Sequence, residues 1–80
     1  MTRDEQFMRL ALAEAQKAAE NGEVPVGCVI VYKDQVIAAG RNRREKGKSA
    51  LAHAEIAAIR RACRVLGGWR LWECELYVTL

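Results

Sequence analysis

A nearly unbroken run of apolar and β-branched residues, Val24 to Tyr32, constrains this chain more than any other feature. A strand with one face in water alternates apolar and polar residues, so a run without alternation predicts a strand covered on both faces. Pro25 donates no hydrogen bond to a ladder and therefore fits only at the start of such a strand. The rest of the chain has to supply elements for both faces.

The first covering element is predicted at the N-terminus. Thr2 and Glu5 have the form of a capping box, and apolar or small residues then recur at helical spacing from Phe7 to Ala19. Asn21-Gly22 supplies residue types that tolerate a left-handed C-terminal cap. We therefore expect an amphipathic helix that ends near Glu20.

A second helix is predicted over 52–66, with Gly67-Gly68 as its cap. Its amphipathic character rests on one stripe of residues: Ile56, Ile59, Cys63 and Leu66.

Two further strands complete the predicted elements. Lys33 to Gln35 form a short polar turn, and the apolar run resumes at 36–40, which predicts an antiparallel hairpin with the first strand. Residues 41–49 are polar and mostly basic and predict a loop, whereas 74–80 alternate with the period of a strand. The order helix, strand, strand, helix, strand indicates an α/β layered fold with a small mixed sheet.

Length and composition restrict the class of protein. Eighty residues allow one small domain. No apolar stretch approaches the roughly 18 residues that a spanning helix needs, and Thr2 to Glu5 are too acidic to open a secretory signal, so we expect a cytoplasmic protein without a membrane partner. The three cysteines, Cys28, Cys63 and Cys74, are too widely spaced for a C-x-x-C clip, and we interpret them as reduced, small hydrophobic residues.

Charge is uneven along the chain. Residues 1–40 carry four basic and six acidic groups, and residues 41–80 carry nine and four. Such a basic second half can neutralise phosphates, although a solvated loop is an equally good explanation of the residues alone. The nine cations are Arg41, Arg43, Arg44, Lys46, Lys48, Arg60, Arg61, Arg64 and Arg70.

The triplet His53-Ala54-Glu55 is the candidate catalytic motif. Two residues apart in mid-helix, His53 and Glu55 would lie about 200° apart and could not share a ligand. In the first turn of a helix they can flank one point, where His53 would ligate zinc and Glu55 would shuttle a proton. A capping or surface histidine is the alternative explanation of these three residues.

Several short motifs occur in one order along the chain: Val-Pro-Val-Gly, the hairpin, Asn-Arg-Arg, His-Ala-Glu-Ile, Gly-Gly-Trp-Arg-Leu and Leu-Tyr-Val-Thr-Leu. Together they resemble the cytidine/deoxycytidylate deaminase superfamily, and within it the bacterial branch that acts on adenosine in tRNA. The resemblance covers Met8 to Leu80. It implies a cytidine-deaminase-like layered fold.

The resemblance also implies an activity and a site. The activity would be zinc-dependent hydrolytic deamination of adenosine to inosine at the wobble position of a tRNA anticodon stem-loop, in a homodimer with one zinc per intact subunit. His53 would be a zinc ligand, Glu55 the general acid/base, and Asn42 a contact to the flipped base or its sugar. Val26 and the backbone of Ala54 would line the pocket. A strand-terminating Asn, a core Val and a helix-start Ala are the structural alternatives.

The chain departs from the family pattern at its end. Directly after Leu-Tyr-Val-Thr-Leu the family continues into Glu-Pro-Cys-x-x-Cys, whose cysteine pair supplies two further zinc ligands. We therefore expect residues 1–80 to be the N-terminal portion of a single deaminase domain that continues beyond Leu80, and the chain alone to be inactive, since a catalytic zinc needs about three protein ligands. Its sheet would lack the last strands and helices.

Two other functions stay open at this stage. One is a deaminase of a free nucleobase such as guanine or cytosine, because such enzymes share His-Ala-Glu. The other is a non-catalytic remnant with a basic face that binds RNA or a protein partner. Trp69 and Trp72 could stack on bases, but in a connection between a helix and a strand we expect both in the core.

Overall fold

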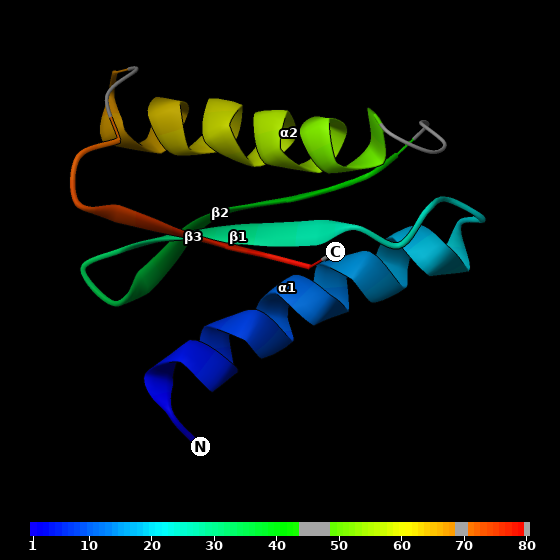
Figure 1. Ribbon diagram of the computed structural model, residues 1–80. Helices are drawn as coiled ribbons and strands as arrows, with labels where there is room; N and C mark the ends of the chain where they lie inside the picture. Colours follow the sequence, from blue (N-terminus) through cyan, green and yellow to red (C-terminus); the bar gives the residue numbers. More distant parts are fainter. Residues whose placement is uncertain (44–48, 69–70, 80) are drawn as a thin grey trace.

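The computed structural model contains the predicted elements in the predicted order and describes residues 1–43, 49–68 and 71–79. Figure 1 shows three layers, with the sheet between the two helices. The elements are α1 (Arg3–Glu20), β1 (Gly27–Tyr32), β2 (Gln35–Arg41), α2 (Ser49–Leu66) and β3 (Cys74–Val78).

The sheet has the strand order β2-β1-β3, and β1 pairs antiparallel with both neighbours. The expected α/β layering is confirmed, but the mixed sheet is not found among the described strands. β2 and β3 do run parallel, because α2 returns the chain between them, yet β1 lies between the two strands and they do not pair. The hairpin turn is Lys33-Asp34, and both residues have positive φ (50° and 64°), as a two-residue type I′ turn requires.

The central strand is covered on both faces, as its composition predicted. Cys28 and Ile30 belong to the core cluster on the α2 side, whereas Val29 and Val31 belong to the cluster on the α1 side. All four side chains are at most 2% exposed. The period of two along a strand thus divides one apolar run between two cores.

The first helix begins and ends as predicted. Thr2 accepts a hydrogen bond from the Glu5 N–H, and the Glu5 carboxylate accepts one from the Thr2 N–H, which completes the capping box. At the other end Gly22 has φ +75°, and its N–H and that of Glu23 donate to carbonyl oxygens of the last turn. The residues that α1 buries are Phe7, Ala11, Ala15 and Ala18.

The second helix differs from its prediction in two respects. It begins at Ser49, three residues before the predicted start. The side that packs on the sheet is a row of alanines, and the predicted stripe is largely outside it: Ile56 is 49% and Ile59 38% exposed. The sheet-facing residues are Ala50, Ala54, Ala58 and Ala62.

Close approach to a glycine explains why only alanines fit under α2. A Cβ placed on Gly40 of β2 would collide with the Ala54 carbonyl oxygen and the Ala58 nitrogen. Gly27 of β1 has the same relation to α1, where a Cβ would meet the backbone of Ala11 and Ala15. Each helix therefore rests on the sheet through one glycine, and neither contact leaves room for a larger side chain.

The prediction that Trp72 lies in the core is wrong, because its side chain is 70% exposed. Trp72 sits in the turn that reverses the chain before β3, next to Glu73 at φ +61°. Leu71 and Cys74, on either side of this turn, are the residues that pack against the α2-side core. Trp69 lies outside the described residues. The described cysteines are free, as expected, but only Cys28 is fully buried.

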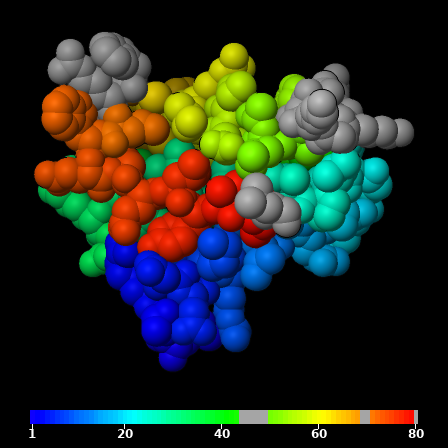
Figure 2. All heavy atoms as spheres, viewed as in Figure 1, coloured from blue at the N-terminus to red at the C-terminus, as the bar shows by residue number. Residues whose placement is uncertain are grey.

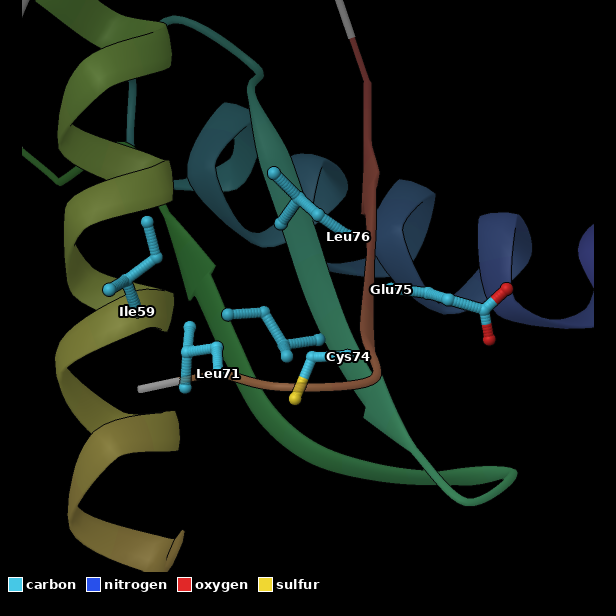
Figure 3. A pocket seen from close by; sticks show the side chains of 6 residues that line it. Ile59, Leu71, Cys74, Glu75 and Leu76 are labelled. Carbon is cyan, nitrogen blue, oxygen red and sulfur yellow. The ribbon is translucent and has the colours of Figure 1, made fainter. Parts of the chain in front are cut away.

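A cavity of about 190 Å³ separates α2 from β3. Figure 3 shows that it is apolar: Ile59, Leu71 and Leu76 surround it, while the carboxylate of Glu75 points away toward α1. In Figure 2 the red β3 segment lies at the surface between α2 and α1. The α2 side of β3 thus leaves an apolar surface only partly covered, with Leu76 42% exposed.

Candidate active site

The predicted substrate-binding residues come together at one end of the sheet. The start of β1, the ends of β2 and β3, and the first half of α2 meet there. In layered α/β proteins, ligands bind beside the carboxyl ends of strands, and here the parallel β2 and β3 both end at this place. Val26 just before β1, Asn42 just after β2 and Ala54 of α2 are 7%, 0% and 0% exposed.

Asn42 is held firmly at this end of the sheet. Its N–H donates to the Val26 carbonyl oxygen at 3.0 Å, and its side-chain Nδ2 donates to the Val24 carbonyl oxygen at 3.3 Å. These bonds tie the residue after β2 to the segment before β1. A buried, oriented amide is suitable for recognition of a polar ligand, and the same bonds also fit the alternative of a strand-terminating Asn.

His53 and Glu55 occupy different environments on α2. His53 is exposed and Glu55 is half-buried, with the fully buried Ala54 between them. The predicted first-turn placement is wrong: since α2 begins at Ser49, both residues lie in its second turn, where regular geometry sets them about 200° apart. The described residues thus place the proton-shuttle candidate nearer to the sheet than the metal-ligand candidate.

Cys28 links the sheet to this helical turn. Its Sγ lies 3.2 Å from the Ala54 carbonyl oxygen, and the contact is buried. Burial, and to a smaller extent the negative charge of Glu55, raise the pKa of the Cys28 thiol to about 11. The thiol is therefore protonated at neutral pH and available as a donor.

The described residues do not complete a zinc site. Residues 1–43, 49–68 and 71–79 contain no group of three or more His, Cys, Asp or Glu side chains that could hold a metal ion. The imidazole of His53 is a chemically suitable donor for zinc, but a catalytic zinc needs about three protein ligands. A metal centre would need donors from outside the described residues.

The basic residues of the second half of the chain divide into two groups. Arg41 pairs with Glu14 of α1 at 3.2 Å, and Arg61 donates to the Ala39 carbonyl oxygen, so these two cations serve contacts within the protein. Arg43, Arg60 and Arg64 are exposed. The other predicted cations, Arg44, Lys46, Lys48 and Arg70, lie outside the described residues.

Sequence reasoning missed two residues at this end of the sheet. Gly40 sets the distance to α2, and a glycine within an apolar strand pattern is a known signal of close backbone approach. Thr79 follows β3 and is buried, and its hydroxyl accepts from the Gly27 N–H and donates to the Gly27 carbonyl oxygen. No local pattern indicates that second role.

The three-layered α/β arrangement, with an asparagine after β2 and His-Ala-Glu on the following helix, agrees with the resemblance to the deaminase superfamily. Comparison with known families gives the same class. The chain belongs to the family described as the cytidine and deoxycytidylate deaminase zinc-binding region, whose family model matches residues 1–80.

The chain is similar to proteins of this family with different substrates. It is 50% identical to the tRNA-specific adenosine deaminase of Bacillus subtilis over 100% of the chain and 50% of that protein. A solved structure from work on A-to-I editing by tRNA:A34 deaminases matches with a TM-score of 0.82 and 49% identity, over 98% of the chain and 60% of that structure. Guanine deaminase from Bacillus subtilis matches with a TM-score of 0.80 and 39% identity, over 94% and 48%.

The chain spans about half the length of the curated relatives it matches. None of the helices in the described part of the chain is long and apolar enough to cross a membrane.

Proposed function

We propose that the intact protein containing this chain is a zinc-dependent deaminase that converts adenosine to inosine at the wobble position of a tRNA. The observation that carries this proposal is the 50% identity, along the whole chain, to a tRNA-specific adenosine deaminase. In this proposal residues 1–80 are the N-terminal portion of one deaminase domain. The half-length match to the relatives supports that division.

Each residue of the candidate site has a proposed role. His53 would be one of the ligands that hold the metal, and when bound, zinc would make a water molecule a stronger acid. Glu55 would accept a proton from the attacking water and deliver it to the departing ammonia. Because regular geometry sets His53 and Glu55 about 200° apart on α2, this proposal requires their side chains to converge on one water in the intact protein. Asn42 would orient the adenine or its sugar by hydrogen bonds, while Val26 and the backbone of Ala54 would form the wall of the base pocket.

Deamination by the intact protein tests this proposal directly. We expect inosine formation in an anticodon stem-loop, and we expect Glu55→Gln to lower kcat by about 10²- to 10⁴-fold because the proton shuttle is lost. His53→Ala should lower the zinc content of the purified protein. Glu20→Gln, an exposed carboxylate at the end of α1, is the matched control and should leave both quantities unchanged. Full activity of Glu55→Gln would contradict the assigned role.

The 80-residue chain by itself should not deaminate. We propose that the remaining zinc ligands, a cysteine pair in the family pattern, lie outside this chain, in accord with the incomplete donor set of the described residues. Purified residues 1–80 should neither bind equimolar zinc nor release ammonia from adenosine in a stem-loop. Stoichiometric zinc with turnover would contradict this.

A free-base deaminase is the second candidate, favoured by the structural match to guanine deaminase. Substrate class separates the two functions. Turnover of an anticodon stem-loop without turnover of guanine, cytosine or free adenosine supports the tRNA substrate, and the reverse pattern supports the free-base enzyme. Absence of both activities in the intact protein would leave a non-catalytic RNA- or partner-binding remnant as the explanation.

Partners follow from the same proposal. The anticodon stem-loop would meet the exposed cations Arg43, Arg60 and Arg64, so its binding should weaken with increasing salt concentration. A cytoplasmic location is part of the same proposal, supported by the match to bacterial tRNA-specific relatives. We further propose a homodimer of intact subunits, supported by the exposed apolar residues of α2, Ile56 and Ile59. Light scattering of the intact protein should give twice the subunit mass.

A further inference from the structure

Two neighbouring residues of the sheet contact the same atom of α2. Cys28 of β1 and Gly40 of β2 are register partners, so they lie side by side across the two strands. The Cys28 Sγ lies 3.2 Å from the Ala54 carbonyl oxygen, and a Cβ on Gly40 would collide with that same oxygen. The Ala54 carbonyl oxygen thus accepts a hydrogen bond from β1, while β2 presents a glycine with no side chain to keep this oxygen away.

The atom held in this way belongs to the candidate motif. The Ala54 carbonyl is part of the peptide group that joins Ala54 to Glu55, so its position fixes where the Glu55 backbone lies above the sheet. Ala54 and Cys28 are both 0% exposed, and water does not compete for this contact. A displacement of the carbonyl would move the Glu55 carboxylate with it, because a helical turn moves as a unit.

We propose that Cys28 is a positioning residue for Glu55. The thiol donates to the Ala54 carbonyl oxygen, while Gly40 lets the helix approach, and together they set the height and rotation of the turn that carries Glu55. This inference rests on the proposed catalytic role of Glu55. It differs from the interpretation of Cys28 as a small buried hydrophobic residue, because it assigns the effect to the donor group and not to the volume of the side chain.

Three substitutions separate the donor from the volume. Cys28→Val fills the space without a donor, Cys28→Ser keeps a donor in a side chain of similar length, and Cys28→Ala removes both. In the intact enzyme acting on an anticodon stem-loop, we expect Cys28→Val and Cys28→Ala to lower kcat about two- to five-fold, the range of one weak hydrogen bond, with KM unchanged. Cys28→Ser should keep kcat close to the wild-type value. Equal kcat values for the Val and Ser variants would overturn the proposal.

A spectroscopic measurement makes the result independent of turnover. In the same intact proteins, the carbonyl ¹³C shift of Ala54 and the hydrogen exchange of the Ala58 amide report on the held carbonyl. Both should change in Cys28→Val and Cys28→Ala and return toward the wild-type values in Cys28→Ser.

If the wild-type protein does not deaminate but these signals follow the donor, the proposed function fails and the positioning contact stands. Signals that ignore the donor overturn the contact itself. If Cys28→Val fails to fold, Cys28→Ala and Cys28→Ser still test the donor, because these two variants differ by one hydroxyl group.

Discussion

The two helices rest on opposite faces of the sheet through the same kind of contact, yet the two faces are completed to different degrees. Under α1, Gly27 lies against Ala11 and Ala15, and under α2, Gly40 lies against Ala54 and Ala58. Both pairs are alanines four residues apart, which form one ridge of a helix. The difference begins beyond this shared contact.

The α1 face is closed at its far end by a network of charged and aromatic groups. Arg3 donates to Asp34 of the hairpin turn and to Glu75 and Tyr77 of β3, and its guanidinium lies 5.0 Å from the centre of the Phe7 ring. The Phe7 and Tyr77 rings lie 5.4 Å apart. One end of α1 is therefore joined to the β1–β2 turn and to the edge strand β3.

The α2 face has an open apolar side. α2 packs on β1 and β2, and the cavity beside Ile59 separates it from β3. The comparison indicates that close helix–sheet contact and complete coverage are separate properties. The close contact is present on both faces, and on the α2 face it coincides with the helical turn that carries the candidate motif.

Replacement of the two glycines should have the largest effect. Gly27→Ala and Gly40→Ala each force a methyl group into a helix backbone, and we expect each to lower the free energy of unfolding by about 3 kcal/mol or more. Urea denaturation measures this. Gly68→Ala is the control, since a Cβ there has nothing within 4 Å, and its stability should stay within about 0.5 kcal/mol.

The same pair of variants distinguishes the two faces. Where the proteins remain folded, Gly40→Ala should shift the amide resonances of Ala54 and Glu55, whereas Gly27→Ala should shift those of Ala11 and Ala15. Equal disturbance of the α2 turn by both variants would show that the two contacts are coupled through the sheet and not separate.

A second prediction concerns which side of α2 is buried. Ala58→Leu adds volume where the helix meets Gly40 and should lower the free energy of unfolding by about 1–3 kcal/mol. Ile56→Ala removes as many carbon atoms as Ala58→Leu adds, but from a half-exposed position, so the change should stay within about 0.5 kcal/mol. Thermal or urea unfolding of the 80-residue chain compares the two. A larger loss of unfolding free energy for Ile56→Ala than for Ala58→Leu would mean that the isoleucine stripe is the buried side of α2.

The sequence predicted the order of the helices and strands better than it predicted which side of α2 packs on the sheet. Period and turn residues gave the element order and the doubly covered β1, because these depend on local patterns. The side of α2 that packs on the sheet depends on Gly40, which is distant in the sequence from the helix. Hydrophobicity favours Ile56 and Ile59, but the short distance between helix and sheet admits only alanine.

The candidate site shows the same division. His53, Glu55 and Asn42 could be proposed as site residues because a motif in fixed order carries them. The contact of Cys28 with Ala54 is a tertiary relation between a strand and a helix, and no local pattern encodes it. Trp72 shows the opposite error, since a large apolar residue in a turn was assigned to the core although the turn directs it outward.

A third, smaller prediction tests the start of α1. Thr2→Ala removes the side-chain half of the capping box and should cost about 1 kcal/mol of stability.

Hydrogen bonds from the Thr2 backbone and side chain hold the pKa of the Glu5 carboxyl below its ordinary value of 4.5. The stabilisation by this carboxylate is therefore present above pH 4.5 and lost as the pH falls through the lower folded-state pKa. Glu5→Gln should remove this part of the acid sensitivity in a series of unfolding curves.

The smallest expected effect concerns the network that closes the α1 face. Arg3→Gln removes the cation shared by Asp34 and Glu75, and because these groups are exposed, salt should screen much of their attraction. We expect a lower Tm for Arg3→Gln at low salt and a smaller difference from the wild type at high salt. Arg9→Gln, an exposed cation on the same helix, should show little change at either concentration. A loss of stability that is independent of salt would mean that Arg3 acts through its packing on Phe7, so that the α1 face, like the α2 face, would depend on close contact and not on charge.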